Sequence, residues 1–434
     1  CGGGCATNLM LPLKFIRNHE ALVRERLATR YAEIPLDELL EYDEQRRELL
    51  SEVEDLRAKR NTVSRQIGEA SNTERESLID RTRELTTALD ESNPKLASIE
   101  ATIDRLLLEI PMLPHKSVPV GDSHHPGELR FASGDPPTIN GTWPSHVEIG
   151  EALGILDFSR SARISGSGFW VYRGAGARLQ RALIQWMLDL QIREHGYREL
   201  YLPALVTETS MRNAGKLPKF SDDAYHIDNS RLWLSPTAEV ALAEYHAGET
   251  LEIEQLPAKY VAHAPAFRQE AGAAGTETRG LRRVHQFDKI EIFNLTLPED
   301  SYNAMDRMCA EAETTIQRLG LTYRIREVPT GDLGFTAAKQ YDLEVWSPGA
   351  AEWLEVSSIS NCETFQTRRS GVRVRKSSSN NSEYAHSLNG TALGLPRTYV
   401  ALLETGHQAN GTVVVPDVLQ PYMDGCTHIA AEPV

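Results

Sequence analysis

Two runs of apolar residues recur at heptad spacing in the first quarter of the chain. A first run has one seam position interrupted by Arg60 and comprises Leu49, Val53, Leu56, Val63 and Ile67. A second run alternates steps of four and three residues without a slip: Leu78, Thr82, Leu85, Leu89, Ser92, Leu96, Ile99, Ile103, Leu106 and Ile110. Heptad spacing gives a helix one apolar stripe that must pack against a partner. The polar stretch led by Gly68 separates the runs, so the pattern predicts an antiparallel helical hairpin that turns near residues 68–77.

Positive charge gathers at the predicted turn of this hairpin. The whole chain carries a net charge of −15, yet residues 57–83 contain seven basic and four acidic residues, which is a net +3. About 30 residues at ~1.5 Å each make an arm roughly 45 Å long, and the cluster falls at its far tip. A local basic patch is typical of phosphate contacts, although such charges can also be only a solvated helix face. The candidate nucleic-acid-binding residues are Arg57, Arg60, Arg65, Arg75 and Arg81.

Composition favours a large intracellular protein. The 434 residues, 41% of them hydrophobic, suffice for one large domain and a smaller one. No apolar run approaches the ~20 residues that cross a bilayer, so we expect a soluble, cytoplasmic protein without a membrane partner. The five cysteines are scattered, which argues against a disulfide framework and a structural zinc site. We interpret the glycine-rich residues 1–9 as an extension left by expression or processing; the alternative is the start of a lipidated chain.

Composition also changes along the chain and predicts its division. A Pro- and Gly-rich stretch follows Ile110 and is typical of a linker. We therefore expect an extension at 1–9, a helical arm at 10–115, a linker at 116–146 and a large domain at 147–434. Periodicity predicts helices at 146–156 and 177–196 and strands at 260–267, 284–293, 341–347 and 352–360. Successive strands with short connections favour an antiparallel sheet flanked by helices, so the fold class is α+β.

No glycine-rich phosphate motif of the P-loop or dinucleotide-binding kind is present, so side chains must hold any nucleotide. Arg268 and Glu270 lie at the end of the predicted strand 260–267, before a loop rich in Gly and Arg. Arginine grips a phosphate or carboxylate at two points and keeps its charge when partly buried. The predicted strand, loop and strand form a hairpin that is a candidate anion site.

Alternation along the next strand, 284–293, places His285, Phe287, Lys289 and Glu291 on one face. The ring of Phe287 could stack on a base, and the carboxylate of Glu291 could hold an amino group. The alternative is equally open at this stage: Phe287 belongs to the core and Glu291 pairs with a lysine.

Further candidates lie nearer the C-terminus. Glu355 and Ser358 supply a carboxylate and a hydroxyl, the hard oxygen ligands that suit Mg²⁺, although a surface glutamate is the commoner meaning. Asn389, Thr391 and Arg397 fall in a predicted Gly-rich turn that enters an apolar helix. A cation near a helix N-terminus is unfavourable by itself, so Arg397 suggests an anionic partner.

Five separated segments together resemble the class II aminoacyl-tRNA synthetases of the seryl type, in the family order. They are GYRELYLPALV (motif one), LSPTAEVAL (the serine-binding loop), AFRQEAG with GTETRGLRRVHQFDKIE (motif two), LEVSSISNCETFQTRR, and NGTALGLPRTYVALLE (motif three). The predicted hairpin resembles the arm with which these enzymes grip tRNA. The resemblance runs from about Met10 to Tyr422.

The resemblance implies a role for each matching residue. It assigns serine binding to Thr237, Glu239, Arg268, Glu291, Asn389 and Thr391. It assigns ATP binding to Arg268, Glu270, Arg283, Val284, Phe287, Glu355, Ser358 and Arg397. Glu355 and Ser358 would hold Mg²⁺, and the residues expected to carry catalysis are Arg268, Glu355 and Arg397.

As a whole, the resemblance implies a serine–tRNA ligase that uses ATP and Mg²⁺, acts on L-serine, tRNA(Ser) and tRNA(Sec), and forms a homodimer. Two other functions compete with this interpretation. An amino acid:carrier-protein ligase would lack the long hairpin. A non-catalytic paralogue would be expected to lack Arg268, Glu355 or Arg397, whereas a specialised second copy of the enzyme would keep every motif.

Overall fold

A computed structural model describes residues 11–137, 142–270, 280–375 and 381–431, without the side chains of Asn72 and Thr73. The expected extension at 1–9 and residues 271–279 of the predicted hairpin loop lie outside this range. The chain divides into two compact units. Of the described residues, the smaller unit contains those from 11–25 and 32–111, and the larger unit contains those from 26–31 and from 112 onward.

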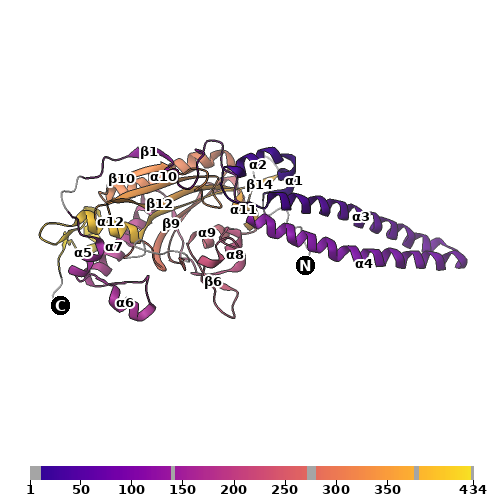
Figure 1. Cartoon of the computed structure of the whole chain (residues 1–434), viewed down its shortest axis with the longest axis horizontal. Helices are drawn as coiled ribbons and strands as arrows, with labels where there is room; N and C mark the ends of the chain where they lie inside the picture. Colours follow the sequence, from indigo (N-terminus) through magenta and orange to yellow (C-terminus); the bar gives the residue numbers. More distant parts are fainter. Residues whose placement is uncertain (1–10, 138–141, 271–279, 376–380, 432–434) are drawn as a thin grey trace. The chain divides into compact units, whose positions relative to one another are not determined.

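The smaller unit is a long helical hairpin (Figure 1). Two short helices, α1 (Leu13–Asn18) and α2 (Glu20–Ala28), precede α3 (Leu36–Glu69) and α4 (Asn72–Glu109). Val53 of α3 and Leu89 and Leu96 of α4 are buried together in its core. These are heptad positions, so the predicted hairpin is confirmed.

The turn of the hairpin is shorter than the sequence suggests. Gly68 lies inside α3, and only Ala70 and Ser71 separate the two helices. The Ser71 hydroxyl and backbone N–H donate to the Glu74 carboxylate, at 2.8 and 3.4 Å. This capping contact starts α4 early, and one glycine costs a helix only ~1 kcal/mol. The polar stretch is therefore mostly helical, which corrects the expectation that Gly68 ends the first helix.

The larger unit is built on an eight-stranded sheet of order β1-β10-β11-β12-β15-β9-β8-β4. Its strands are β1 (Glu128–Ala132), β4 (Arg198–Glu199), β8 (Ala258–Phe267), β9 (Gln286–Thr296), β10 (Tyr323–Glu327), β11 (Lys339–Ser347), β12 (Glu352–Glu363) and β15 (His386–Gly394). Every neighbouring pair is antiparallel except β4 with β8. The predicted antiparallel α+β fold is confirmed.

Helices and small sheets surround this sheet. The helices are α5 (His146–Ala152), α6 (Phe158–Ser165), α7 (Gly174–Arg193), α8 (Glu208–Asn213), α9 (Glu239–Glu244), α10 (Ser301–Arg318), α11 (Phe365–Ser370) and α12 (Leu395–Gly406). The minor strands are β2 (Leu156–Asp157), β3 (Val171–Tyr172), β5 (Leu205–Thr207), β6 (Leu232–Leu234), β7 (Thr250–Glu252), β13 (Arg373–Arg375), β14 (Ser382–Tyr384), β16 (Val413–Val414) and β17 (His428–Ile429). Leu183 of α7, Met305 of α10 and Leu403 of α12 share one buried cluster with Ile292 of β9, so these helices cover a face of the sheet. None of the described helices has the length and apolar character required of a membrane span.

Two segments differ from their predicted structure. Residues 389–391 were expected in a turn, yet they lie in β15, in the middle of the sheet. A Cβ on Gly390 would lie 2.3 Å from the Ile359 side chain, so this glycine permits close packing between strands and does not mark a turn. Strand β1 falls within residues 116–146, the expected linker, and forms one edge of the sheet.

A buried arginine fixes one loop of the larger unit. The Arg30 side chain donates to the carbonyl oxygens of Leu333 (2.9 Å), Gly334 (3.1 Å), Ala337 (2.7 Å) and Met112. Burial lowers the pKa of Arg30 to about 10. One guanidinium thus satisfies carbonyls of a loop more than 300 residues away in the sequence.

We expect Arg30→Ala to destabilise the larger unit by about 3 kcal/mol or more, because several buried carbonyls lose their donor together. All six tryptophans lie in this unit, so their fluorescence during urea unfolding reports its stability. Arg193→Ala is the matched control, because the Arg193 side chain is 72% exposed and its ion pair with Asp189 is a surface one. Equal urea midpoints for the two variants would contradict the prediction.

Candidate active site

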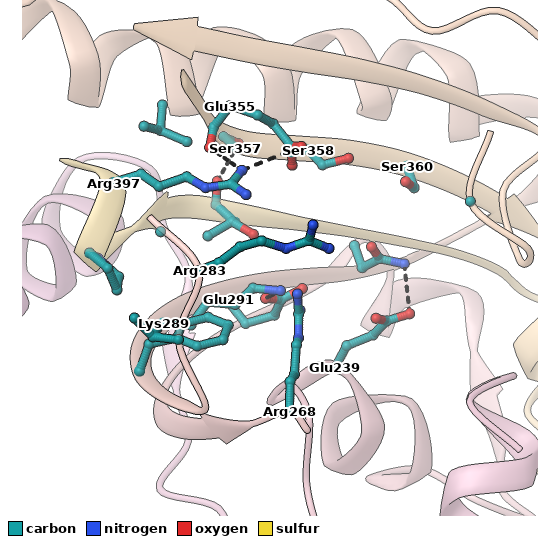
Figure 2. Close-up of a pocket in the computed structure, with 18 of the residues that line it drawn as sticks. Glu239, Arg268, Arg283, Lys289, Glu291, Glu355, Ser357, Ser358, Ser360 and Arg397 are labelled. Carbon is teal, nitrogen blue, oxygen red and sulfur yellow. Dashed lines mark hydrogen bonds and ion pairs between the residues drawn. The ribbon is translucent and has the colours of Figure 1, made fainter. Parts of the chain in front are cut away.

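A cavity of about 370 Å³ opens between β9, β12 and β15, the first turns of α9 and α12, and the loops that follow α8 and precede β11 (Figure 2). Its lining includes twelve of the thirteen residues predicted outside the hairpin: Glu239, Arg268, Glu270, Arg283, Val284, Phe287, Glu291, Glu355, Ser358, Asn389, Thr391 and Arg397. The thirteenth, Thr237, does not line the cavity and lies behind Glu291. Residues far apart in sequence therefore meet at one site.

Glu291 and Thr391 form the floor of one end of the cavity. They are directly opposite each other on β9 and β15, because the register pairs these two residues. The Glu291 carboxylate contacts Lys289 Nζ at 2.5 Å and accepts from the Thr237 hydroxyl at 3.4 Å. Lys289 Nζ also donates to Thr237 Oγ1, at 3.0 Å. Thr237 therefore supports Glu291 from behind.

A second buried carboxylate, that of Glu239, lies beside this end. It accepts from Lys216 Nζ (2.7 Å), from Gln366 Nε2 (2.7 Å) and from Asn389 Nδ2 (3.2 Å). Lys216 comes from the loop after α8 and Gln366 from α11. Three separate segments thus fix the orientation of Glu239 and Asn389.

The two carboxylates have opposite pKa shifts. Burial works to raise the pKa of Glu239, but the Lys216 ammonium and its hydrogen bond outweigh burial, so the pKa lies below the usual value. Burial also raises the pKa of Glu291, the Lys289 ammonium lowers it, and the charge of Glu239 raises it again. The resulting pKa is about 7. This end of the cavity therefore favours a further positive charge near Glu291.

Arg268 and Phe287 form the adjacent wall. The Arg268 guanidinium carbon lies 5.1 Å from the centroid of the Phe287 ring, and Nε donates to the Pro236 carbonyl at 3.4 Å. Phe287, Lys289 and Glu291 all line the cavity, as strand alternation predicts. Phe287 is therefore not a residue of the closed core.

Two more arginines enter the cavity from other directions. Arg283 Nε contacts the Glu270 carboxylate at 3.1 Å. Arg397, in the first turn of α12, donates to the Glu355 carbonyl at 2.9 Å and lies 3.7 Å from its carboxylate. Figure 2 shows Arg268, Arg283 and Arg397 reaching into the same space. Three guanidinium groups with open space between them make a strong site for a polyanion.

Glu355 and Ser358 share a face because β12 contains a bulge. Glu355 pairs with Glu344 and Ser357 with Leu343, so Val356 is an extra residue. Without it, two residues three positions apart would point to opposite faces. Asp342 lies opposite Ser358, and its pKa is raised to about 8 by burial and by the charge of Glu355. These oxygen atoms form an acidic surface that a divalent cation would neutralise.

Several residues of the site have no sequence signal. Lys216 occupies a loop outside every recognised segment, and Asp342 is one acidic residue in a strand. Gln366 lies within the recognised segment LEVSSISNCETFQTRR, but nothing in the sequence indicates a role for it. Lys289 alone had a signal, because alternation places it on the face of Phe287 and Glu291. We identify the other three only through their contacts with Glu239 and Ser358.

The candidate nucleic-acid-binding arginines lie on the hairpin. Arg65, Arg75 and Arg81 are exposed near the turn, whereas Arg60 is half-buried. Arg57 donates to the Asn93 side chain at 2.9 Å, across the hairpin. Arg65, Arg75 and Arg81 provide exposed positive charge on both helices near the turn.

Comparison with known proteins identifies the class and then the family. Residues 220–406 match the model of the tRNA synthetase class II core domain (G, H, P, S and T), and residues 10–114 match the seryl-tRNA synthetase N-terminal domain. The serine–tRNA ligase of Thermomicrobium roseum is 46% identical over 98% of this chain and 96% of its own length. That of a Roseiflexus species is 47% identical over 96% and 98%.

A solved structure agrees with these relatives. The seryl-tRNA synthetase of Pyrococcus horikoshii, complexed with ATP, superposes with a TM-score of 0.91 at 34% identity, over 98% of this chain and all of that one. This chain belongs to the seryl-tRNA synthetase family of class II aminoacyl-tRNA synthetases. The resemblance noted in the sequence is thereby confirmed.

We expect Lys216→Met to destabilise the larger unit by about 3–5 kcal/mol at pH 7, because it leaves the buried Glu239 carboxylate without its cation. The pKa of Glu239 is lowered in the folded protein, so this ion pair stabilises the fold above about pH 4.5 and is lost as the pH falls through the folded pKa. The difference in unfolding free energy between the variant and the unmodified protein should therefore become smaller in acid.

Urea unfolding followed by tryptophan fluorescence measures this effect. The double variant Lys216→Met/Glu239→Gln should recover much of the stability, because it also removes the unpaired charge. If the double variant were as unstable as the single one, the effect would come from the packing of the lysine stem and not from its charge.

Proposed function

We propose that this chain is a serine–tRNA ligase, which joins L-serine to AMP and then transfers the seryl group to tRNA. The observation that carries the proposal is the cavity itself. A pair of buried carboxylates lies at one end, Arg283 and Arg397 reach into the other, and Arg268, which contacts the Phe287 ring, lies between them. The ammonium group of an α-amino acid and the phosphates of a nucleoside triphosphate together have the complementary distribution of charge.

The end near Glu291 suits serine. The Glu291 carboxylate, with a pKa of about 7, would be stabilised in its charged form by the ammonium group of the amino acid. Thr391 faces the same space and offers a hydroxyl to the short side chain, while Asn389 and Glu239 hold that wall in place. Thr237 acts through Glu291 and Lys289 and is a positioning residue in this proposal.

Arg268 lies between the two ends and would bridge the serine carboxylate and the α-phosphate. A serine carboxylate oxygen attacks the α-phosphorus, the bond from this phosphorus to the β-phosphate oxygen breaks, and pyrophosphate leaves. The terminal hydroxyl of tRNA then attacks the seryl carbonyl carbon, and AMP leaves. Charge neutralisation and alignment of the two substrates account for the catalysis, without a protein nucleophile.

The remaining cavity residues suit ATP. Phe287 and Arg397 would enclose the adenine ring, Glu270 and Val284 lie beside them, and Arg283 would neutralise the outer phosphates. A chain with these contacts and a complete tRNA-binding hairpin fits a ligase for tRNA better than one for a carrier protein.

The acidic surface at β12 fits Mg²⁺. The Glu355 side chain is 47% exposed and lies beside Ser358 on one face of the strand, so both oxygens are accessible from the cavity. The described residues contain no group of three or more His, Cys, Asp or Glu ligands, so phosphate oxygens and water would complete the coordination. When bound there, Mg²⁺ would neutralise phosphate charge as pyrophosphate leaves.

The wider assignment follows the family. We propose residues 10–115 as the tRNA-binding arm, residues 116–146 as its linker and residues 147–434 as the catalytic domain. tRNA(Ser) and tRNA(Sec) would be the nucleic-acid substrates, and the active form would be a cytoplasmic homodimer. Full-length similarity to serine–tRNA ligases favours this function over a carrier-protein ligase or a non-catalytic paralogue.

We expect Arg268→Ala to lower serine-dependent ATP–pyrophosphate exchange at least about a hundredfold, because the variant loses a charge-stabilising donor at the reacting phosphate. Arg193→Ala, far outside the cavity lining, is the matched control and should retain full exchange. Near-normal exchange in Arg268→Ala would reject the proposed bridging role.

We expect deletion of residues 36–108, closed by a short linker, to leave pyrophosphate exchange measurable and to abolish tRNA charging. The deletion retains Arg30 and every residue of the cavity. A finer variant replaces Arg65, Arg75 and Arg81 with Gln and should flatten the salt dependence of tRNA affinity by about one unit of log–log slope for each phosphate that is no longer neutralised. Arg105→Gln, at the other end of α4, is the control; equal slopes for the two proteins would mean that the tip is only solvated.

A further inference from the structure

His146 links α5 and α12 to the end of the β8–β9 connection. It is the first residue of α5, and it is 4% exposed. Its Nε2 lies 3.2 Å from the backbone nitrogen of Leu281, and its Nδ1 lies 3.0 Å from the Glu404 carboxylate. A Cβ on Gly280 would be only 2.2 Å from Nε2, so the ring fits closely against this backbone.

Hydrogen-bond satisfaction fixes the form of the imidazole. Glu404 accepts from the backbone N–H of His146 (2.9 Å) and of Gly349 (3.0 Å), and from the Ser347 hydroxyl. An ionised carboxylate only accepts, so Nδ1 carries the proton. The Leu281 N–H only donates, so Nε2 must offer its lone pair. The neutral imidazole protonated at Nδ1 alone satisfies both neighbours.

The electrostatics of Glu404 support the same arrangement. Its side chain is fully buried, and burial by itself would raise the pKa of this carboxyl. Hydrogen bonds from His146 and Ser347 outweigh burial and hold the pKa below its usual value. Glu404 is thus a fixed anion that orients the ring.

Helix α12 then holds the segment Leu281–Arg283 at two successive residues. Glu404, through His146, fixes the N–H of Leu281, and Arg397 Nε donates to the Arg282 carbonyl at 3.3 Å. Arg397 and Glu404 are seven residues apart, about two turns along one side of the helix. The segment held in this way carries Arg283, which enters the cavity.

We propose that His146 is a positioning residue for the nucleotide: through its Nε2 it anchors the backbone that carries Arg283 and that meets Arg397. The proposal rests on the proposed function for its substrate, ATP. It predicts a selective effect, because the Glu291 carboxylate is held by Lys289 and Thr237, which are different residues from those that hold Leu281 and Arg282.

Two substitutions separate the two contacts of the ring. His146→Asn keeps a donor near the Nδ1 position for Glu404 but has no atom at the Nε2 position. His146→Gln places an amide oxygen near Nε2, where it can accept from Leu281. His195→Asn is the matched control, since His195 binds Gln191 with its Nδ1 at 2.9 Å and does not line the cavity.

In serine-dependent ATP–pyrophosphate exchange, His146→Asn should raise KM for ATP about tenfold or more, with KM for serine changed less than about twofold. His146→Gln should restore most of the ATP affinity. A purely structural role would lower the thermal midpoint of both variants without separating the two KM values. An unchanged KM for ATP in His146→Asn, or an equal rise of both KM values that Gln does not relieve, would overturn the proposal.

Hydrogen exchange tests the anchor independently of activity. The peptide that contains Leu281 should exchange faster in His146→Asn than in the unmodified protein, and His146→Gln should restore its protection. Unaltered protection in His146→Asn would overturn the anchor even if the enzyme is active. Absence of serine-dependent exchange in the unmodified protein, with Leu281 protection behaving as expected, would instead reject only the proposed substrate.

Discussion

Two carboxylates are buried together at one end of the cavity, and the rest of the site is arranged around the need to balance their charge. Lys216 and Lys289 contact Glu239 and Glu291 directly. The compensation is unequal, because the pKa of Glu239 is lowered whereas that of Glu291 is raised to about 7. An incoming ammonium group would complete the balance, so the protein's own electrostatics favour an amino acid at this end. Thr391 lies directly across from Glu291, and in the proposed function it would read the hydroxyl of a small side chain.

Arginine side chains line the rest of the cavity. Arg283 and Arg397 reach into the other end, Arg268 lies between the two ends, and each is kept in place by a different element. Arg268 follows β8, Arg283 precedes β9, and Arg397 lies in the first turn of α12. The acidic surface of Glu355 and Asp342 borders these arginines, and it explains how a polyanionic phosphate chain and a divalent cation could share the site. In the proposed function, carboxylates at one end and arginines at the other would orient the two substrates before any bond changes.

The backbone that holds these groups is fixed from a distance. Arg30 binds the carbonyls of the loop that supplies Gly334, Phe335 and Thr336 to the cavity wall. His146 and Glu404 play the corresponding part for the segment before Arg283. Neither Arg30 nor His146 lines the cavity. Each makes hydrogen bonds to main-chain atoms of a segment that does line it, and so fixes the position of that segment. A rigid site therefore requires residues from both ends of the chain.

The sequence by itself determined the elements whose periodicity is local. Heptad spacing specified the hairpin, and alternation placed Phe287, Lys289 and Glu291 on one face of β9, because a side chain's direction in a regular helix or strand follows from its position alone. Only the tertiary structure decided which faces meet. The bulge at Val356 aligned Glu355 with Ser358, Gly390 proved to lie in a central strand, and Thr237 lay behind Glu291. Lys216, Gln366 and His146 joined the site through loops and short helices. Strand register and loop approach depend on packing between residues distant in sequence, and a single sequence carries no periodic signal for such contacts.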